Sequence, residues 1–497
     1  MAITGGSLLN KVPSAQQQAL ASNYIDFAGG STGWEQQYLP DLMEKEAEVF
    51  GNRTISGFLS QVGAEEAMTA DQVVWSEQSR LHLSYTGTVD ANGDTNGTFT
   101  VTADIDGSAD GENGFAVASH GVRVNDIVLI AQAGVVVKAL VVETPASAVI
   151  TVEPYATAAL STLSDGAGTL LVVGSEFGKG QSYSDITGTA AADKRTALEP
   201  TFKSYSNKPI IMKDYYEVSG SDASQIGWVE VTGEEGQNGY LWYLKAEGDT
   251  RARFTDYLEM AMLESELNLA ASQIDGNALV SGSSAGASNV GTEGLFAAIE
   301  SRGNETSGIT GINAATDLAE FDAILAEFDS QGAIEENMMF VNRGTSLAID
   351  DMLASMNSYG AGGTSYGVFS NDEEMALNLG FSGFRRGSYD FYKSDFRYLN
   401  DKATRGSINT TAGSAAIRGV IIPAGVSSVY DQSLGKNLKR PFLHVRYRAS
   451  QTDDRKLKTW VTGSVGAQTS ALDAMQIHYL SERCLVTQGA NNFMLMQ

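Results

Sequence analysis

Four short segments have residue types and spacings that resemble catalytic or ligand-binding motifs. Two of them, residues 29–33 (GGSTG) and 282–286 (GSSAG), match G-x-S-x-G, the turn that presents the nucleophilic serine of many hydrolases. That turn requires a buried strand before the serine and a helix after it, and no strand-like run precedes either match. We therefore expect no catalytic residue in these segments and no enzymatic activity of the chain.

The third segment, residues 174–180 (GSEFGKG), follows an apolar strand-like run over Thr169–Val173. A phosphate-binding loop has four residues between its glycines, then Lys, then a Ser or Thr whose hydroxyl holds magnesium. Here three residues separate the glycines, and Gly180 replaces the hydroxyl residue. We interpret the segment as the exit loop of a β-rich domain and predict no bound cofactor.

The fourth segment alternates acidic and hydroxyl residues as a calcium-binding loop does, at Asp104, Asp106, Ser108, Asp110 and Glu112. Ala109 stands where such a loop needs a sharp-turn glycine, and Phe115 stands where it needs a bidentate glutamate. We expect a solvated turn and no metal site. The alternative is a surface cation held without a dedicated ligand set.

Cysteine and histidine usage leaves little room for other metal or redox chemistry. The single cysteine, Cys484, excludes an intrachain disulfide and a cysteine-based zinc site, and no two of the four histidines are spaced i, i+4. Because Arg483–Val486 has the character of a buried strand, we predict that Cys484 is an inert core thiol. A fold without covalent or metal cross-links is typical of a protein made in a reducing cytoplasm.

The charge balance argues against a protein whose main task is to grip nucleic acid. The chain has 60 acidic and 33 basic residues, a formal net charge of −27, whereas a nucleic-acid-binding surface must be basic to displace counterions. The balance is compatible with a subunit that encloses DNA, because an acidic inner wall would repel the genome. No apolar run reaches the ~18 residues of a membrane span, and the N-terminus lacks the pattern of a secretory signal.

With 497 residues and 42% apolar content, the chain is long enough for two to four domains. Residues 1–50 have the character of an extended arm and residues 51–83 of a partly helical segment. From residue 84 to about 175, apolar and polar residues alternate between turn residues, which predicts a small inserted β barrel with strands at 98–103, 126–130, 135–142 and 148–152. Further strands are expected at 209–213 and 228–231.

The second half of the chain predicts an α+β domain. A long helix over residues 250–272, capped by Asp249 or Thr250, is apolar on two sides and should pack on two sides. A short helix around Leu295–Ile299 and an amphipathic helix over Leu318–Phe328, capped by Thr316, follow it. The remaining elements are a helix at 347–353 and strands at 338–342, 389–398, 419–422, 442–447 and 475–486.

This order of parts resembles the major capsid proteins of tailed bacteriophages, which have the Hong Kong 97-type (Johnson) fold. Asn337–Asn342 after the helix 318–328 is similar to the first strand of that family's axial domain. Arg418–Val426 resembles a late axial strand, and His478–Thr487 with Gly489–Phe493 resembles the return to the peripheral domain. The wording is most similar to the capsid proteins of crAss-like phages.

The resemblance implies a division of the chain into family domains. They are an N-terminal arm (1–50), an extended loop with flanking peripheral segments (51–83 and 181–240), the inserted β-barrel-like domain (84–180), a peripheral domain with a spine helix (241–315), an axial domain (316–470) and a return to the peripheral domain (471–497). The implied function is self-assembly into hexamers and pentamers that form an icosahedral shell around double-stranded DNA. The implied partners are other copies of the chain, portal, accessory or head-decoration proteins, and a separate scaffold. The implied location is the virion, with synthesis in the bacterial cytoplasm.

Contacts between subunits are expected at apolar residues, glycines and basic residues of four segments. These are Trp34, Tyr38 and Leu42 of the arm, Tyr215, Tyr216 and Trp228 of the extended loop, Gly360, Gly362 and Gly363 of a loop near the symmetry axis, and Lys439, Arg440 and Arg446 of a basic segment over 436–458. A solvated loop is the alternative for the basic segment. For the whole chain, the alternative function is a β-rich adhesin or receptor-binding module, which the acidic, Gly- and Asn-rich strand region favours.

Overall fold

The computed structural model describes a mixed α+β protein of two open sheets, one closed barrel and the helices that cover them. The described residues are 64–78, 80–91, 97–111, 115–144, 148–156, 162–181, 202–221, 231–232, 238–239, 241–268, 291–332, 334–356, 383–411, 416–424, 426–431, 436–464 and 470–497. Within them the α+β class and the small β barrel that the sequence predicts are confirmed.

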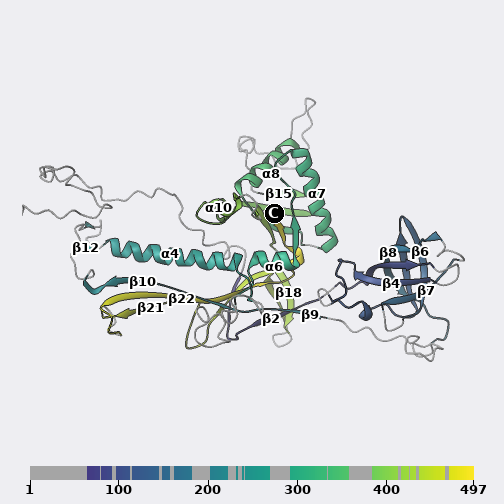
Figure 1. Ribbon diagram of the computed structural model, residues 1–497, viewed down its shortest axis with the longest axis horizontal. Coiled ribbons are helices and arrows are strands. Elements are labelled where there is room, and N and C mark those ends of the chain that lie inside the picture. Colours follow the sequence, from purple (N-terminus) through teal and green to yellow (C-terminus); the bar gives the residue numbers. More distant parts are fainter. Residues whose placement is uncertain are drawn as a thin grey trace, which may run out of the picture.

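The first sheet is built around one long strand, β22 (Ala474–Thr487). On one side β22 pairs with β10 (Ile210–Ser219), and on the other with β21 (Lys458–Gly463) and then β20 (Leu443–Arg448), which pairs in parallel with β1 (Ala64–Met68). The long helix α4 (Leu241–Glu264) lies along β10 and β22 (Figure 1). Phe254 and Leu258 of α4 pack on Ile477 and Tyr479 of β22 and bury one face of the sheet.

The second sheet has six strands in the order β13 (Asn304–Thr306), β23 (Met494–Met496), β17 (Gly419–Pro423), β14 (Glu336–Val341), β16 (Tyr389–Asp395) and β15 (Gly383–Arg386). Helices α7 (Ala314–Gln331) and α8 (Arg343–Met356) cover it, because Phe321 and Phe328 of α7 and Ile349 and Met352 of α8 share a core with Met339. Short helices α9 (Arg397–Asn400) and α10 (Arg405–Asn409) follow β16.

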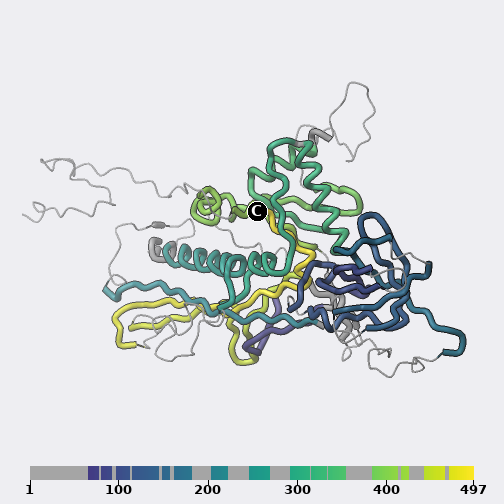
Figure 2. Tube along the Cα trace, turned by 45° about the vertical axis from the view of Figure 1, so that its right-hand side comes forward, coloured from purple at the N-terminus to yellow at the C-terminus, as the bar shows by residue number. Residues whose placement is uncertain are grey.

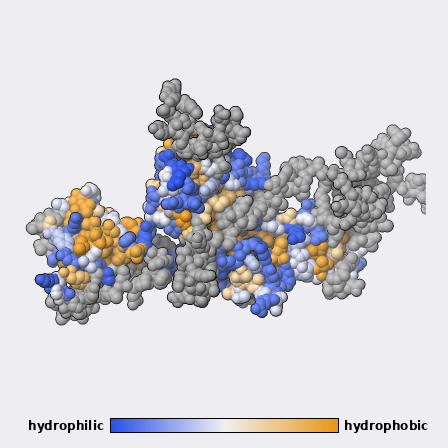
Figure 3. Space-filling model, turned by 180° about the vertical axis from the view of Figure 1, so that it is seen from behind, coloured by the Kyte–Doolittle hydropathy of each residue, from blue (hydrophilic) through white to orange (hydrophobic). Residues whose placement is uncertain are grey.

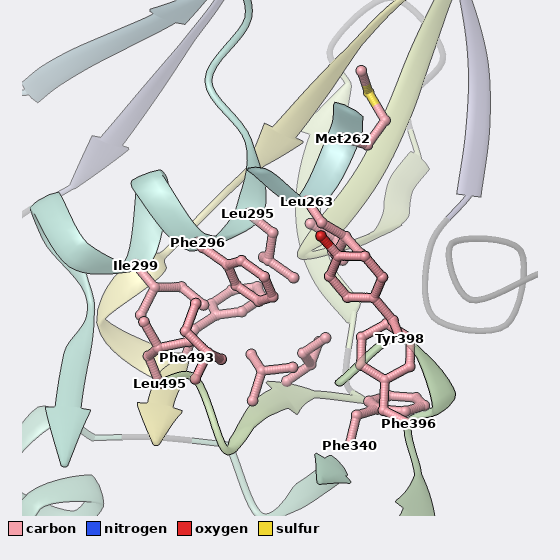
Figure 4. Packing of buried hydrophobic residues seen from close by; sticks show 14 of the residues in the cluster. Met262, Leu263, Leu295, Phe296, Ile299, Phe340, Phe396, Tyr398, Phe493 and Leu495 are labelled. Carbon is pink, nitrogen blue, oxygen red and sulfur yellow. The ribbon is translucent and has the colours of Figure 1, made fainter. Parts of the chain in front are cut away.

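A continuous core joins the two sheets. Helix α6 (Leu295–Arg302) contributes Leu295, Phe296 and Ile299, which Figure 4 shows facing Phe493 and Leu495. The other labelled members of this core are Met262 and Leu263 from the end of α4, Phe340 from β14, and Phe396 and Tyr398 at the start of α9. The end of α4 is also tied to α9 and α10 through Glu264, which accepts hydrogen bonds from the Tyr398 hydroxyl (2.8 Å) and Arg405 (2.6 Å).

The barrel closes in the order β3-β4-β7-β6-β5-β8. Its strands are β3 (Ser84–Asp90), β4 (Gly97–Asp104), β5 (Asp126–Gln132), β6 (Val135–Glu143), β7 (Val149–Pro154) and β8 (Gly166–Ser175), with a short helix η4 (Val117–Ser119) beside them. Inward side chains such as Phe99, Ile130, Ile150 and Leu170 fill the interior completely, as small barrels require. The barrel therefore has a core of its own.

A two-stranded stem of β2 (Val73–Gln78) and β9 (Phe202–Asn207) connects the barrel to the first sheet. Figures 1 and 2 show the barrel held at one end of the elongated molecule, while β21 and the end of β10 lie at the other end. Two short hairpins, β11–β12 (Val231–Thr232 and Asn238–Gly239) and β18–β19 (Val426–Asp431 and Lys436–Pro441), and the turn η7 (Ala490–Asn492) complete the described elements.

Several sequence predictions of local structure are wrong. The described part of residues 51–83 contains strands β1 and β2 instead of helix, because their partners β20 and β9 are far away in the sequence. The long helix begins at Leu241 instead of near Thr250, whose hydroxyl donates to the Ala246 carbonyl inside the helix, and it ends at Glu264 instead of Ser272. Packing along the sheet outweighs the local capping signals there.

Two further corrections concern helix caps and strand ends. Asn313, not Thr316, caps α7, since its side chain accepts from the amide of Ala315. The strand predicted over 389–398 ends at Asp395, and α9 follows. Strands β20 and β21 lie in the first sheet because they pair with β22, and β13 and β23 lie in the second. The implied domain boundaries stay predictions.

Candidate functional site

The motif-like segments do not form a catalytic or phosphate site where the structure describes them. Residues 29–33 and 282–286 lie outside the described residues. Residues 174–180 leave strand β8 as predicted, but a turn follows up to Gln181, whose side chain accepts from the Gly178 amide (2.8 Å). A phosphate loop needs a helix at this point.

The carboxylates of Asp104, Asp106 and Asp110 face different partners, and Glu112 lies outside the described residues. Asp106 is held by the guanidinium of Arg80 through two nitrogen atoms, the shorter contact being 2.6 Å. Asp110 accepts from the amide of Val117, and Asp104 accepts from the amide of Ile105. Throughout the described part of the chain, no group of three or more His, Cys, Asp or Glu side chains is arranged to hold a metal ion.

Cys484 lies fully buried in strand β22, as predicted. Burial raises the pKa of its thiol to about 12, and the positive charge of Arg446 only partly opposes this. Because the thiolate is the reactive form, the thiol is unreactive at neutral pH, which agrees with an inert core residue.

The basic segment 436–458 finds most of its acidic partners inside the chain. Arg446 pairs with Glu66 of β1 (3.0 Å), and Glu482 of β22 pairs with both Arg448 (2.6 Å) and Arg455 (2.7 Å). Strands β1 and β22 therefore bring acidic partners next to these three arginines within one chain. Side chains of Lys439 and Arg440 lie outside the described residues, and their role stays a prediction, as does contact of Arg446 with a neighbour.

The root of the stem is clamped to α6 by an arginine that lies over two neighbouring aromatic rings. The Arg302 guanidinium lies 4.5 Å from the ring centre of Tyr205 and 5.7 Å from that of Trp75, one residue from each stem strand. It also pairs with Glu293 at 2.6 Å, and both side chains are mostly buried. Burial raises the pKa of Glu293, while the charge of Arg302 opposes this rise.

Asn207, at the end of β9, is the polar centre of the same root. Its side-chain amide donates to the carbonyls of Leu485 (2.6 Å) and Glu293 (3.0 Å). Its oxygen accepts from the amides of Lys208 and Glu293 and from the Thr292 hydroxyl. Only 1% of Asn207 is exposed, so its hydrogen-bonding capacity is used within the protein. Neither the Arg302 clamp nor the Asn207 hydrogen bonds could be predicted from the sequence, because the residues that contact one another there are distant in the chain.

The predicted contact residues of the extended loop differ in exposure. Tyr215 and Tyr216 are adjacent in β10, where Tyr215 is 56% exposed and Tyr216 is half-buried near Glu247, whose charge adds to burial in raising its pKa. The other apolar and glycine candidates, Trp34, Tyr38, Leu42, Trp228, Gly360, Gly362 and Gly363, lie outside the described residues. All of them stay predictions as inter-subunit contacts.

Apolar side chains also gather on the outside of the barrel, and Figure 3 shows a broad apolar area there. Val136 of β6 (58% exposed) and Val173 of β8 (60% exposed) belong to it. The signal was present in the sequence: Ile127–Ile130 and Val135–Val137 are continuous apolar runs, which indicate a strand that is apolar on both faces. These runs predicted strands, but their apolar outer positions were not recognised as a surface.

Comparisons with known proteins add the following findings. No protein-family model matches the chain, and no curated protein matches it. Similar solved structures include a chain of Microbacterium phage Oxtober96 (9% identity, 94% of this chain and 97% of that chain, TM-score 0.39) and one of Gordonia phage Cozz (10%, 97% and 98%, TM-score 0.39). A chain from the capsid of a native GTA particle is 11% identical over 95% of this chain and 99% of that chain, with a TM-score of 0.37.

In addition, none of the helices within the described ranges is long and apolar enough to cross a membrane.

Proposed function

We propose that this chain is a structural shell subunit, the major capsid protein of a tailed bacteriophage with the Hong Kong 97-type fold, most similar to those of crAss-like phages. The stretches that carry the sequence resemblance support this proposal, because they form central strands of the two sheets. Asn337–Asn342 and Arg418–Val426 contribute β14 and β17 to the second sheet, and His478–Thr487 forms most of β22 in the first. In the proposal, α4 is the spine helix, and the second sheet is the core of the axial domain.

The observation that carries the proposal is the shape of the chain together with its exposed apolar surface. A barrel with its own core is held away from the main body on a two-stranded stem, and part of its outer wall is apolar (Figure 3). The edge strand β10 of the first sheet exposes the side chains of Tyr215 and Ile211. Apolar faces on protruding parts are typical of a subunit whose surface is completed by other subunits.

In this proposal many copies form hexamers and pentamers that close around double-stranded DNA without sequence-specific contacts. Each subunit is tied to its neighbours by several modest contacts, and these become collectively stable. The net charge of −27 suits a wall that does not adsorb the genome. Portal, decoration and scaffold proteins would be further partners, the virion would be the location, and the role would be structural and not enzymatic.

The test is the size of the purified protein at increasing concentration. Sedimentation and negative-stain microscopy should show capsomers, sheets or closed shells. A strictly monomeric protein would contradict the proposal, and glycan or cell-surface binding by that monomer would favour the adhesin. Particles of the chain imaged by electron microscopy would also give the numbers of hexamers and pentamers.

A further inference from the structure

The barrel has an outer face that is apolar where a solvated barrel would be polar. Strands β8, β5 and β6 are neighbours in the barrel, and their outward side chains include Val173, Leu171, Leu129 and Val136. Leu171 is 39% exposed and Val173 is 60% exposed, while Leu129 is half-buried. We call this surface the barrel face. Lys138, which pairs with Leu129, is its exposed charged residue.

A second such surface lies on the first sheet, on the side opposite α4. Tyr215 of β10, His478 of β22 and Trp460 of β21 are aligned across three strands. The His478 ring stacks on Trp460 at 5.1 Å between ring centres and lies 6.0 Å from that of Tyr215. Ile211 and Lys213 lie on the same face of β10 as Tyr215, and Ile211 is 52% exposed. We call this surface the aromatic face.

The aromatic face continues a surface that the chain covers with strands. On the same side of β22, Cys484 and Val486 share a core with Trp75 of the stem and Met68. A two-stranded ribbon thus packs on one half of this side, and the aromatic face is the half that it leaves open. The surface that fits such a face is another β layer, since sheets pack face to face through their side chains. The barrel face is a β layer of this kind.

The two faces cannot cover each other within one copy, because they lie at opposite ends of the molecule (Figures 1 and 2). Charge favours their meeting between copies. The barrel face carries Lys138 as its exposed charge, whereas the aromatic face carries both signs, with exposed Lys213 and Glu217 on either side of Tyr215 in β10. Two barrel faces packed on each other would bring two Lys138 residues together, whereas the aromatic face offers Glu217 on the same side of β10 as Tyr215.

We propose that the barrel face of one copy docks on the aromatic face of a second copy, as a heterologous contact that repeats from subunit to subunit. This rests on the assembly function proposed above and names the surfaces that carry it. The core of the contact is apolar, with Val173 and Leu171 against Tyr215 and Trp460. Lys138 and Glu217 lie toward its rim.

The experiment uses two variants of the full chain, Val173→Cys and Tyr215→Cys, carrying different tags. Native Cys484 is buried and does not compete. A short bis-maleimide added to the mixed proteins should join one tag to the other, and each variant alone should give no cross-linked dimer. Cross-linking of Val173→Cys to itself would overturn the proposal, because it would show a symmetric barrel contact.

A second pair of variants measures the contribution of the contact. Val173→Glu should raise the concentration needed for assembly by about tenfold or more, from the loss of one buried valine. Thr102→Glu, on the exposed outside of strand β4 across the barrel, should leave it unchanged. Shells that form without tag-to-tag cross-links, or equally well with Val173→Glu, would refute the docking and leave the assembly function standing. Parent protein that never assembles would refute both.

Discussion

Asn207→Ala should loosen the stem and leave the barrel folded. The substitution removes the side chain that satisfies the amide of Glu293, the Thr292 hydroxyl and the carbonyl of Leu485 at a site that is 1% exposed. Each buried polar group left without a partner costs about 1–3 kcal/mol. If two of these groups stay unsatisfied and water reaches the others, the stem root loses about 3 kcal/mol.

Hydrogen exchange measures this loss locally, because it reports the free energy of opening for each segment. A loss of about 3 kcal/mol corresponds to roughly 100-fold faster exchange of the amides in β2 and β9. Amides in the barrel strands should exchange as in the parent, since the barrel core shares no residue with the stem root. Ser206→Ala, one position earlier in β9, is the matched control and should change exchange by severalfold at most.

Two results would refute the reasoning behind the Asn207 prediction. Unchanged exchange in β2 and β9 would mean that the hydrogen bonds of Asn207 contribute nothing net to the stem. Equal acceleration in the barrel and in the second sheet would mean that the protein opens as a single unit, and that the barrel is not independent of its attachment.

Three other predictions concern single sites. Lys393→Met removes the partner of buried Asp350 and should destabilise the α8–β16 contact by about 3–5 kcal/mol in thermal unfolding, while Lys393→Met with Asp350→Leu should recover most of it. Cys484 should resist iodoacetamide in the folded protein at pH 8 and react after denaturation, because burial raises its pKa to about 12 and the thiolate forms only as the pH approaches that value. Gly87→Ala should destabilise the barrel by about 1–3 kcal/mol, measured as loss of exchange protection in β3 and β4, because the added Cβ would lie 2.1 Å from the Thr100 carbonyl oxygen.

The parts of the fold that follow from local pattern were predictable from the sequence. The alternating strands of the barrel, the amphipathic helix around Phe321 and the buried strand around Cys484 all appear where the pattern indicates. The strands near Ala64 and Val73 were not predictable in this way. Their partners β20 and β9 lie far later in the chain, where Ala64 pairs with His444 and Val73 pairs with Asn207, and the segment has no strong periodicity of its own.

The candidate site was predicted only in part, for a related reason. Tyr215 was recognised as an apolar residue that the chain would leave exposed, and the structure shows that exposure. His478 and Trp460 were not connected with it, because only the strand register brings the three rings into one row. The Arg302 clamp joins α6 to both stem strands, and no spacing in the sequence indicates such a contact.

The way the barrel is attached explains how a closed domain can be carried by this fold without disturbing it. The first and last barrel strands, β3 and β8, are direct neighbours, with Ser84 paired to Leu171. The chain therefore enters and leaves the barrel side by side, and β2 and β9 continue the same antiparallel arrangement down to Asn207. Because the stem joins the barrel to the first sheet as one ribbon, the contacts at the root of the stem are enough to attach the barrel to the main body. Outside that root, Arg80 contacts both sides, since it holds Asp106 of the barrel and donates to the Ser330 carbonyl of α7 at 2.8 Å. The direction in which the barrel face points is thus set by the stem, whose root packs on Cys484 and Val486 of β22, and by polar contacts such as those of Arg80, and not by the core of the barrel itself.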